Sequence, residues 1–248
     1  MAGHSKWANI KHRKARQDAA RGKMWSKCSR AIIVAAKNGG GDPAMNLTLR
    51  YAIDEARAAN MPKDTIEKAV KKGAGETEGE SYEETRYEGY GAGGVAVIVD
   101  CLTDNVNRTA PEVRKIFEKG GGNLGKPGAV SFGFQQRGLL MIDAAKTTED
   151  QLMELALEAG AEDVVESGGA WEVTCAPTDF MAVREALEAA GIEPDSAEIT
   201  MIPESTVACD EKTAEKVMRL VDAFEEHDDV QKVYTNADIP DEVLERIG

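Results

Sequence analysis

The apolar residues of this 248-residue chain change their spacing at about residue 75, and this change requires more than one structural unit. Up to that point apolar residues recur every three or four positions, which is the period of amphipathic helices. Beyond it, short runs rich in Val and Ile, typical of strands, alternate with further helical segments. The polar run AGETEGES, residues 74–81, lies between the two regions and is typical of a linker. We therefore expect a multidomain α+β protein that begins with a helical bundle.

Three helices are predicted within residues 1–75, each with one apolar face. The face of the first consists of Met24, Cys28, Ile32 and Ala35. The face of the second consists of Leu49, Ala52, Ile53 and Ala56, and that of the third of Ile66, Ala69 and Val70. The run GGGD at 39–42 ends the first helix. Pro62 is a favoured first residue for the third helix, and Gly73 after two lysines is a typical helix end.

Residues 138–202 follow the order β-α-β-β-α-β, which is the ferredoxin-like arrangement. The strands are predicted at 139–142, 163–166, 171–175 and 197–202, and the helices at 148–159 and 179–190. The flanking sequence predicts strands at 82–89, 95–102, 129–134 and 230–235 with helices at 108–119 and 211–226. These flanking elements together complete a second layered α/β domain. We therefore predict a helical domain at 1–75, a split α/β domain at 82–137 plus 206–248, and an inserted ferredoxin-like domain at 138–205.

Charge is distributed unevenly along the chain. The formal net charge is −14, yet residues 1–37 contain ten Lys or Arg and a single acid, Asp18. Beyond residue 137 the balance reverses, with 7 basic and 28 acidic residues. A basic segment on an acidic body attracts polyanions to one end of the molecule and repels them elsewhere. The alternative is an ordinary solvated face, although a net charge of +9 over 37 residues exceeds normal surface alternation.

The basic segment contains the candidate nucleic-acid-binding residues. The proposed phosphate contacts are Lys6, Lys11, His12, Arg13, Lys14, Arg16, Arg21, Lys23, Lys27 and Arg30. On one continuous helix over residues 11–30, about one quadrant of the surface would contain Arg13, Arg16, Lys23, Lys27 and Arg30. In a second interpretation Gly22 interrupts that helix, and the first twenty residues are a flexible arm that becomes ordered on binding.

Four further residues are weaker candidates. Trp7 would stack on bases if exposed or anchor the helical bundle if buried, whereas Trp25 is expected to be buried. Arg108, with Asn105 and Asn107 beside it, is a second candidate phosphate contact. The structural alternative is that Asn107 caps the following helix and Arg108 faces solvent.

Catalytic motifs are incomplete in this sequence. GYGAGG (89–94) and GGGNLG (120–125) match GxGxxG, but the first leads into a strand and the second leaves a helix. GGGNLGKP (120–127) lacks the Ser or Thr of a phosphate loop, which leaves open an anion-binding loop without catalysis. The histidines have no triad or metal spacing, and the acidic run EEHDD at 225–229 is expected to form a solvated turn. We expect no enzyme activity, catalytic residue, metal, cofactor or small-molecule substrate.

Two features indicate a cytoplasmic protein without a membrane partner. No window reaches the roughly 18 consecutive apolar residues of a spanning helix, and the N-terminus lacks the apolar stretch of a secretory signal. The cysteines are scattered and form no CxxC pair, so we expect free thiols in a reducing cytosol. They are Cys28, Cys101, Cys175 and Cys209.

Several long motifs resemble the YebC/PmpR family, which includes the mitochondrial translational activator of cytochrome c oxidase. They are the opening MAGHSKWANIKHRKARQDAARGK, then GGGDPAMN, RYEGYGAGG, DNVNRTAPEVR, GGNLGKPGAVSF, LEAGAEDV and DSAEITMIP, and they extend over nearly the whole chain. The resemblance implies a cytoplasmic, non-enzymatic protein of three domains that binds nucleic acid. It also implies one of two roles, because some members are described as DNA-binding transcriptional regulators and others as translation factors that act at the ribosome.

The residues themselves leave both roles open. Phosphate-driven binding to duplex DNA needs no recognition helix. A single basic arm without evident dimeric symmetry, however, suits a pocket of structured RNA better than a palindromic operator. We place a DNA-binding transcriptional regulator first, with ribosomal RNA or the ribosome as the alternative partner of a translation factor. A third hypothesis is a protein-interaction module whose acidic lobes are the docking surface.

Overall fold

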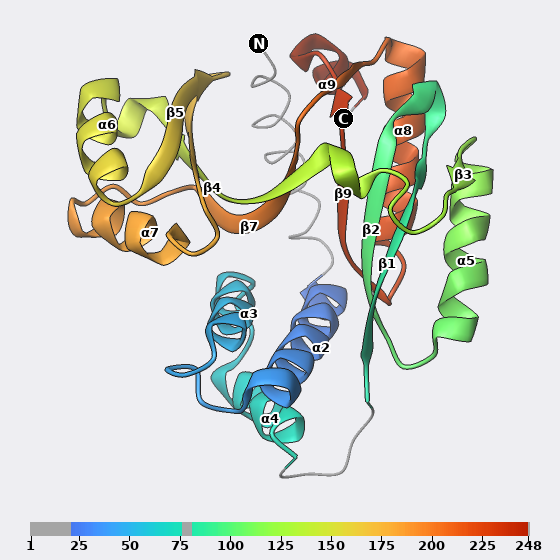
Figure 1. The fold of residues 1–248 in the computed structure, drawn as a ribbon, viewed down its shortest axis with the longest axis horizontal. Coiled ribbons are helices and arrows are strands. Elements are labelled where there is room, and N and C mark those ends of the chain that lie inside the picture. The colour runs from blue at the N-terminus through green and yellow to red at the C-terminus, as the bar shows by residue number, and fades with distance from the viewer. Residues whose placement is uncertain (1–20, 76–80, 248) are drawn as a thin grey trace.

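The structure is a computed structural model, and it describes residues 21–75 and 81–247. These residues form three lobes (Figure 1). One lobe is helical, and each of the other two combines an antiparallel sheet with helices. The prediction of a mixed α/β protein with a helical N-terminal region is therefore confirmed.

The helical lobe has the buried face that the sequence spacing predicted. Its helices are α2 (Arg21–Gly39), α3 (Leu47–Ala58) and α4 (Lys63–Gly73). The buried residues of α3 are Leu49, Ala52, Ile53 and Ala56. Trp25 packs against this core and donates its indole N–H to the Ala59 carbonyl at 3.0 Å. Trp25 therefore anchors the bundle, although it is half-buried and not fully buried as predicted.

Two residues bring these helices close together. Asn46 begins α3 by accepting the Leu49 N–H at 3.1 Å, and its side-chain amide donates to the Ala35 carbonyl of α2 at 2.8 Å. Gly73 allows α4 to approach α2, because a Cβ at this position would lie 2.4 Å from the Ile33 carbonyl oxygen. The Asn46 side chain thus fixes the start of α3 against α2, and the small size of Gly73 allows the end of α4 to pack against α2.

The second lobe contains a four-stranded sheet with the order β3-β1-β2-β9. Its strands are β1 (Glu83–Tyr90), β2 (Ala96–Thr103), β3 (Asn123–Leu124) and β9 (Val230–Thr235). Helices α5 (Val106–Lys119) and α8 (Glu211–Glu225) cover one face of the sheet (Figure 1). Between them Phe117 and Phe224 pack edge to face, with ring centroids 4.8 Å apart. Although β9 lies far from β2 in the sequence, the two strands pair directly.

The predicted strand at 129–134 is wrong. The strand β3 pairs with β1 instead, and Ser131–Gly133 forms a short 3₁₀ turn. The main-chain N–H groups of Gly128, Val130 and Ser131 donate to the Glu88 carboxylate at 2.8–2.9 Å. Because these donors bind a side chain, the segment cannot form a strand ladder. The short elements that the sequence analysis missed are β3, β8 (Val207–Ala208), β10 (Ala237–Asp238) and α9 (Asp241–Ile247).

The third lobe follows the predicted order β-α-β-β-α-β. Its elements are β4 (Phe134–Asp143), α6 (Glu149–Glu158), β5 (Ala161–Ser167), β6 (Ala170–Cys175), α7 (Phe180–Ala189) and β7 (Ser196–Pro203). The sheet has the order β5-β6-β4-β7, and all neighbouring strands are antiparallel. Strands β4 and β7 are longer than predicted and curve from this lobe toward the second one (Figure 1).

Side chains connect the lobes. Tyr51 of α3 and Phe180 of α7 pack edge to face, with ring centroids 5.6 Å apart. Lys232 of β9 pairs with Glu198 of β7 at 3.2 Å. Burial lowers the pKa of Lys232, but the charges of Glu55 and Glu198 outweigh burial and hold this pKa above its ordinary value. Because Glu55 lies on α3, these charges link elements of all three lobes.

The described residues include no helix that is long and apolar enough to cross a membrane.

The four cysteines are buried and free, as predicted. Burial raises the pKa of the Cys28 and Cys101 thiols to about 12. Both thiols therefore stay protonated near neutral pH, and a protonated thiol is a poor nucleophile and metal ligand.

Candidate nucleic-acid interface

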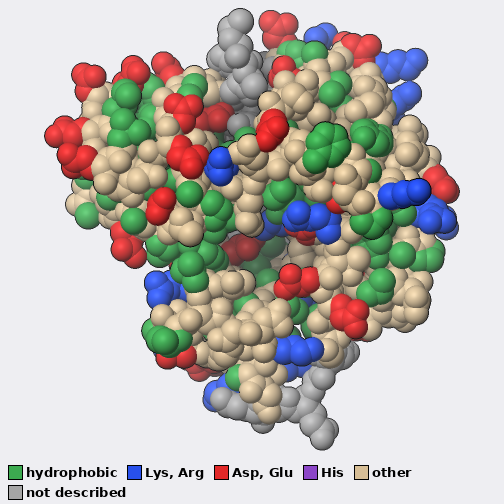
Figure 2. All heavy atoms as spheres, viewed as in Figure 1, with side chains coloured by type: hydrophobic (Ala, Val, Ile, Leu, Met, Phe, Trp, Pro, Cys, Tyr) green, Lys and Arg blue, Asp and Glu red, His purple; other side chains and the backbone are tan. Residues whose placement is uncertain are grey.

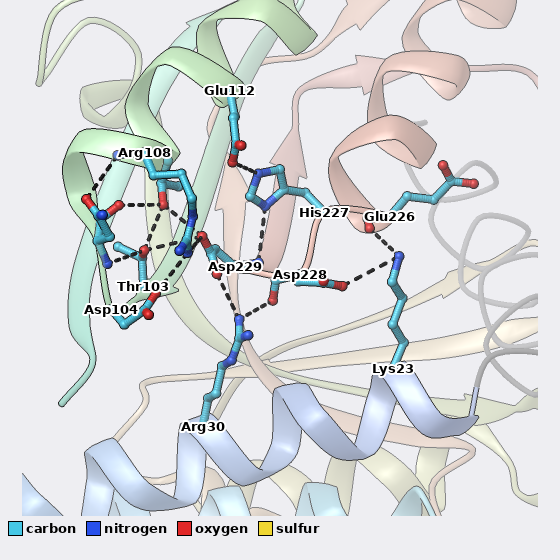
Figure 3. Close-up of polar contacts among 12 residues, drawn as sticks. Lys23, Arg30, Thr103, Asp104, Arg108, Glu112, Glu226, His227, Asp228 and Asp229 are labelled. Atoms are coloured by element: carbon cyan, nitrogen blue, oxygen red, sulfur yellow. Dashed lines mark hydrogen bonds and ion pairs between the residues drawn. The ribbon is translucent and has the colours of Figure 1, made fainter. Parts of the chain in front are cut away.

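The predicted phosphate contacts fall into two groups. Lys6, Lys11, His12, Arg13, Lys14 and Arg16 lie outside the described residues, as does Trp7. Arg21 is the first residue of α2, and Lys23, Lys27 and Arg30 follow in the same helix. These three occupy successive turns on one face, as the helical spacing predicted. Lys23 and Arg30 point into the molecule, toward the turn that follows α8 (Figure 3).

The three cations bind main-chain carbonyls at the C-terminal end of α8. Lys23 Nζ donates to Glu226 O, Lys27 Nζ donates to Glu225 O at 2.8 Å, and Arg30 Nη1 donates to Asp228 O. Carbonyls at a helix C-terminus lack partners within the helix and lie at the negative end of its dipole, so they attract cations. Burial lowers the pKa of Lys27, and the charge of Glu225 opposes this shift. The contact holds α2 against the second lobe.

Asp229 is the centre of the polar network beside this contact (Figure 3). Its side chain is 3% exposed and accepts from Arg30 at 3.0 Å, from Arg108 at 2.8 Å and from Thr109 Oγ1 at 2.8 Å. Burial raises the pKa of Asp229, but these hydrogen bonds and the two guanidinium charges outweigh burial and hold the pKa below its ordinary value. The prediction of a solvated turn at 225–229 is wrong at Asp229, because cations from α2 and α5 draw its carboxylate inward.

Arg108 belongs to the same network, and Asn107 is not the helix cap. Asn105 caps α5, because its side-chain oxygen accepts the Arg108 N–H at 3.1 Å. Asn107 lies in the first turn of α5. The Arg108 guanidinium pairs with Asp104 and with Asp229, both at 2.8 Å, and so it does not simply face solvent. The predicted cap at Asn107 is therefore wrong, because Asn105 is the cap. Arg108 is exposed, as the structural alternative expected, but its guanidinium is also paired.

Glu112, His227 and Asp229 meet at this place, which the spacing of the histidines did not indicate. His227 Nδ1 accepts the Asp229 main-chain N–H at 3.1 Å, so in the neutral ring Nε2 holds the proton and donates it to Glu112 at 2.9 Å. The three residues offer ligand atoms within 4.8 Å of one another. Arg30 and Arg108 bind Asp229, however, and their positive charges oppose a metal ion. The three residues therefore form a hydrogen-bonded cluster that connects α5 to the turn after α8.

A cavity of about 690 Å³ lies between α2 and α5, next to this network. The cationic residues that line it are Lys23 and Arg30 of α2 and Arg108, Lys115 and Lys119 of α5. Lys115 and Lys119 were not among the sequence candidates, although a spacing of seven and eleven residues from Arg108 places all three on one helix face. Five acidic residues line the cavity as well, namely Asp104, Glu112, Glu226, Asp228 and Asp229. Acidic side chains also gather over the lobe of α6 and α7 (Figure 2).

The loop that follows GGGNLGKP binds an anion, and this anion is the carboxylate of Glu88. Glu88 is only 6% exposed. Burial raises its pKa, but the N–H groups of Val130, Gly128 and Ser131 outweigh burial and hold the pKa below its ordinary value. An anion-binding loop was one possibility that the sequence allowed here. In the structure these N–H groups donate to a carboxylate of the protein itself.

We predict that Glu88→Gln lowers the free energy of unfolding by about 2–3 kcal/mol, because hydrogen bonds to a buried charged acceptor are strong. The folded-state pKa is depressed, so the contribution of Glu88 is present above about pH 4.3, the unfolded value, and is lost as the pH falls further. Urea denaturation at neutral and acidic pH measures both effects. Glu84→Gln, at an exposed position of β1, is the control. Equal losses in the two variants at neutral pH would contradict this prediction.

Comparison with known proteins identifies the family. The family model "TACO1/YebC protein N-terminal domain" matches residues 5–76, and "TACO1/YebC second and third domain" matches residues 82–237. A "Probable transcriptional regulatory protein" of Shewanella oneidensis is 57% identical, with 100% of both chains covered. Another from Halothermothrix orenii is 55% identical and covers 100% of this chain and 99% of the relative. The crystal structure of a conserved hypothetical protein from Aquifex aeolicus matches with a TM-score of 0.80 at 50% identity, covering 91% of this chain and 93% of that one. The chain therefore belongs to the TACO1/YebC family.

Proposed function

We propose that this protein is a cytoplasmic, non-enzymatic regulator of gene expression that binds nucleic acid through its basic N-terminal segment, residues 1–37. The observation that best supports this proposal is the separation of charge. That segment contains ten Lys or Arg and one acid, whereas residues 138–205 contain two basic and sixteen acidic residues. Phosphates are attracted to the first and repelled by the second. We also propose that the lobes are the three domains 1–75, 82–137 plus 206–248, and 138–205.

Two nucleic acids are candidates for the target. The relatives named as probable transcriptional regulatory proteins favour duplex DNA. The single basic segment without evident dimeric symmetry favours RNA, because a palindromic operator is bound by a symmetric dimer. Structured RNA is recognised by its shape and by phosphate contacts, which one basic segment can make. We therefore place RNA of the ribosome first, as the target of a translation factor, and duplex DNA second.

The salt dependence of binding tests the role of the phosphates. For a single-stranded RNA of about 20 nucleotides, we expect the logarithm of affinity to fall linearly with the logarithm of salt, by about 0.7 per phosphate contact. Fluorescence anisotropy of the labelled RNA measures this slope for the full chain. Several contacts give a slope steeper than about −2. A slope near zero would mean that the basic segment does not bind phosphates.

A further inference from the structure

The cavity between α2 and α5 has the size of a site for one strand. Its volume of about 690 Å³ lies within the range of about 300–1,000 Å³ that is typical of sites enclosing a compact ligand. A stretch of about one or two nucleotides is such a ligand. The cavity is open to solvent, and part of a single strand can reach its wall.

Cations reach this cavity from both helices. Lys23 and Arg30 come from α2, and Arg108 lies at the start of α5. Lys115 and Lys119 continue the stripe that Arg108 begins, because residues four and seven positions apart share one face of a helix. A groove with positive charge on two sides is the usual path for the backbone of a single strand.

Acidic residues also line the cavity, and most of them have partners. Asp104 and Asp229 pair with Arg108, Asp228 lies 3.6 Å from Lys23, and Glu112 is bonded to His227. The side chain of Glu226 points away from this network (Figure 3). Lys115 and Lys119 are exposed, and within the part of the chain that the structure describes neither has an ion-pair partner. The positive charge that is available to a ligand is thus concentrated at these two lysines.

We propose that Lys115 and Lys119 bind the phosphates of a single RNA strand that enters the cavity between α2 and α5. This inference rests on the proposed function and adds α5 of the second lobe to the basic N-terminal segment as a binding element. The strand then contacts the second lobe in addition to the contacts proposed for the N-terminal segment.

Two double charge reversals in the full chain test this inference. Lys115→Glu with Lys119→Glu places acids on the cavity wall. The control, Lys212→Glu with Lys216→Glu, makes the same change of net charge at exposed positions of α8 outside the cavity. The probes are a mixed-sequence RNA strand of about 20 nucleotides and the matching RNA duplex, each titrated at several salt concentrations.

For the α5 variant we expect the affinity for the single strand to fall about 30- to 100-fold and the salt slope to become shallower by about 1.4, the value for two contacts. The α8 control is expected to stay within about threefold of the unmodified chain. Lys115→Gln with Lys119→Gln, which removes charge without adding repulsion, is expected to give a smaller loss in the same direction. Circular dichroism checks that each variant is folded.

Equal affinities of the α5 variant and the α8 control for the single strand would overturn the inference. An equally large loss for the duplex would overturn it as well, because the effect would then not depend on entry of one strand. Failure of the proposed function has a different result. In that case the unmodified chain binds neither probe, or its binding does not depend on salt.

Discussion

Replacing Arg13, Lys14 and Arg16 together by glutamate is expected to weaken RNA binding about a thousandfold. Each charge-assisted phosphate contact contributes about 1.4 kcal/mol or more, which is about tenfold in Kd, and three contacts are lost. Phosphate contacts do not distinguish bases, so the loss is expected to be the same for all sequences. Fluorescence anisotropy with two unrelated RNA sequences measures both features.

The control for this variant changes the same amount of charge on α4 of the helical lobe. The control substitutions are Lys63→Glu, Lys68→Glu and Lys71→Glu, at exposed positions of α4. We expect them to change affinity by less than about tenfold, because none of these lysines is a proposed phosphate contact. Equal losses in the two variants would assign binding to the overall charge of the lobe. Unchanged affinity in the folded first variant would contradict the assignment of the three residues as phosphate contacts.

Asp229→Asn is expected to lower the free energy of unfolding by about 2 kcal/mol, because hydrogen bonds to a buried charged acceptor are lost. The Asp229 carboxylate lies between Arg30 and Arg108, and its side chain is 3% exposed. Asparagine keeps the shape of the side chain but leaves both guanidinium groups without this counter-charge. Because Arg30 belongs to α2, we also expect faster hydrogen exchange in α2. Urea denaturation and hydrogen exchange measure the two effects.

Asp228→Asn is the matched control for this variant. The Asp228 side chain is 70% exposed and lies 3.6 Å from Lys23, so its loss is expected to cost less than about 1 kcal/mol. The folded-state pKa of Asp229 lies below its ordinary value. Its stabilising contribution is therefore present above about pH 3.9 and disappears as the pH falls further, which reduces the difference between Asp229→Asn and the unmodified protein. Equal stability of the two variants at neutral pH would contradict the central place of Asp229.

Most elements of the fold could be predicted because one face of each is buried. The apolar period alone located α3 and its buried residues, and it placed β9 at Val230–Thr235. The segment 129–134 has strand-forming residues but was wrongly predicted as a strand. Its N–H groups donate to the side chain of Glu88, which lies 42 residues before Val130 in the sequence. The two-residue strand β3 is too short to show any period. Errors thus arose where a distant side chain or a very short pairing determined the local structure.

The candidate site could be predicted only in part. Helical spacing was sufficient to place Lys23, Lys27 and Arg30 on one face. It could not show what this face contacts, because the carbonyl that binds Lys27 is 198 residues away in the sequence. Lys and Arg bind helix C-termini as well as phosphates, so the residue type alone does not show which of the two a side chain contacts. The stripe of Lys115 and Lys119 was visible in the spacing of α5, but its place opposite α2 required the structure.

A competition between purified ribosomes and a random DNA duplex for the labelled protein, at about 0.15 M salt, distinguishes the two candidate targets. We predict that the protein binds ribosomes and that excess duplex does not displace it. Phosphate attraction alone would let the duplex compete, since it offers the higher charge density. Displacement by the duplex would contradict RNA as the target and make duplex DNA the preferred one.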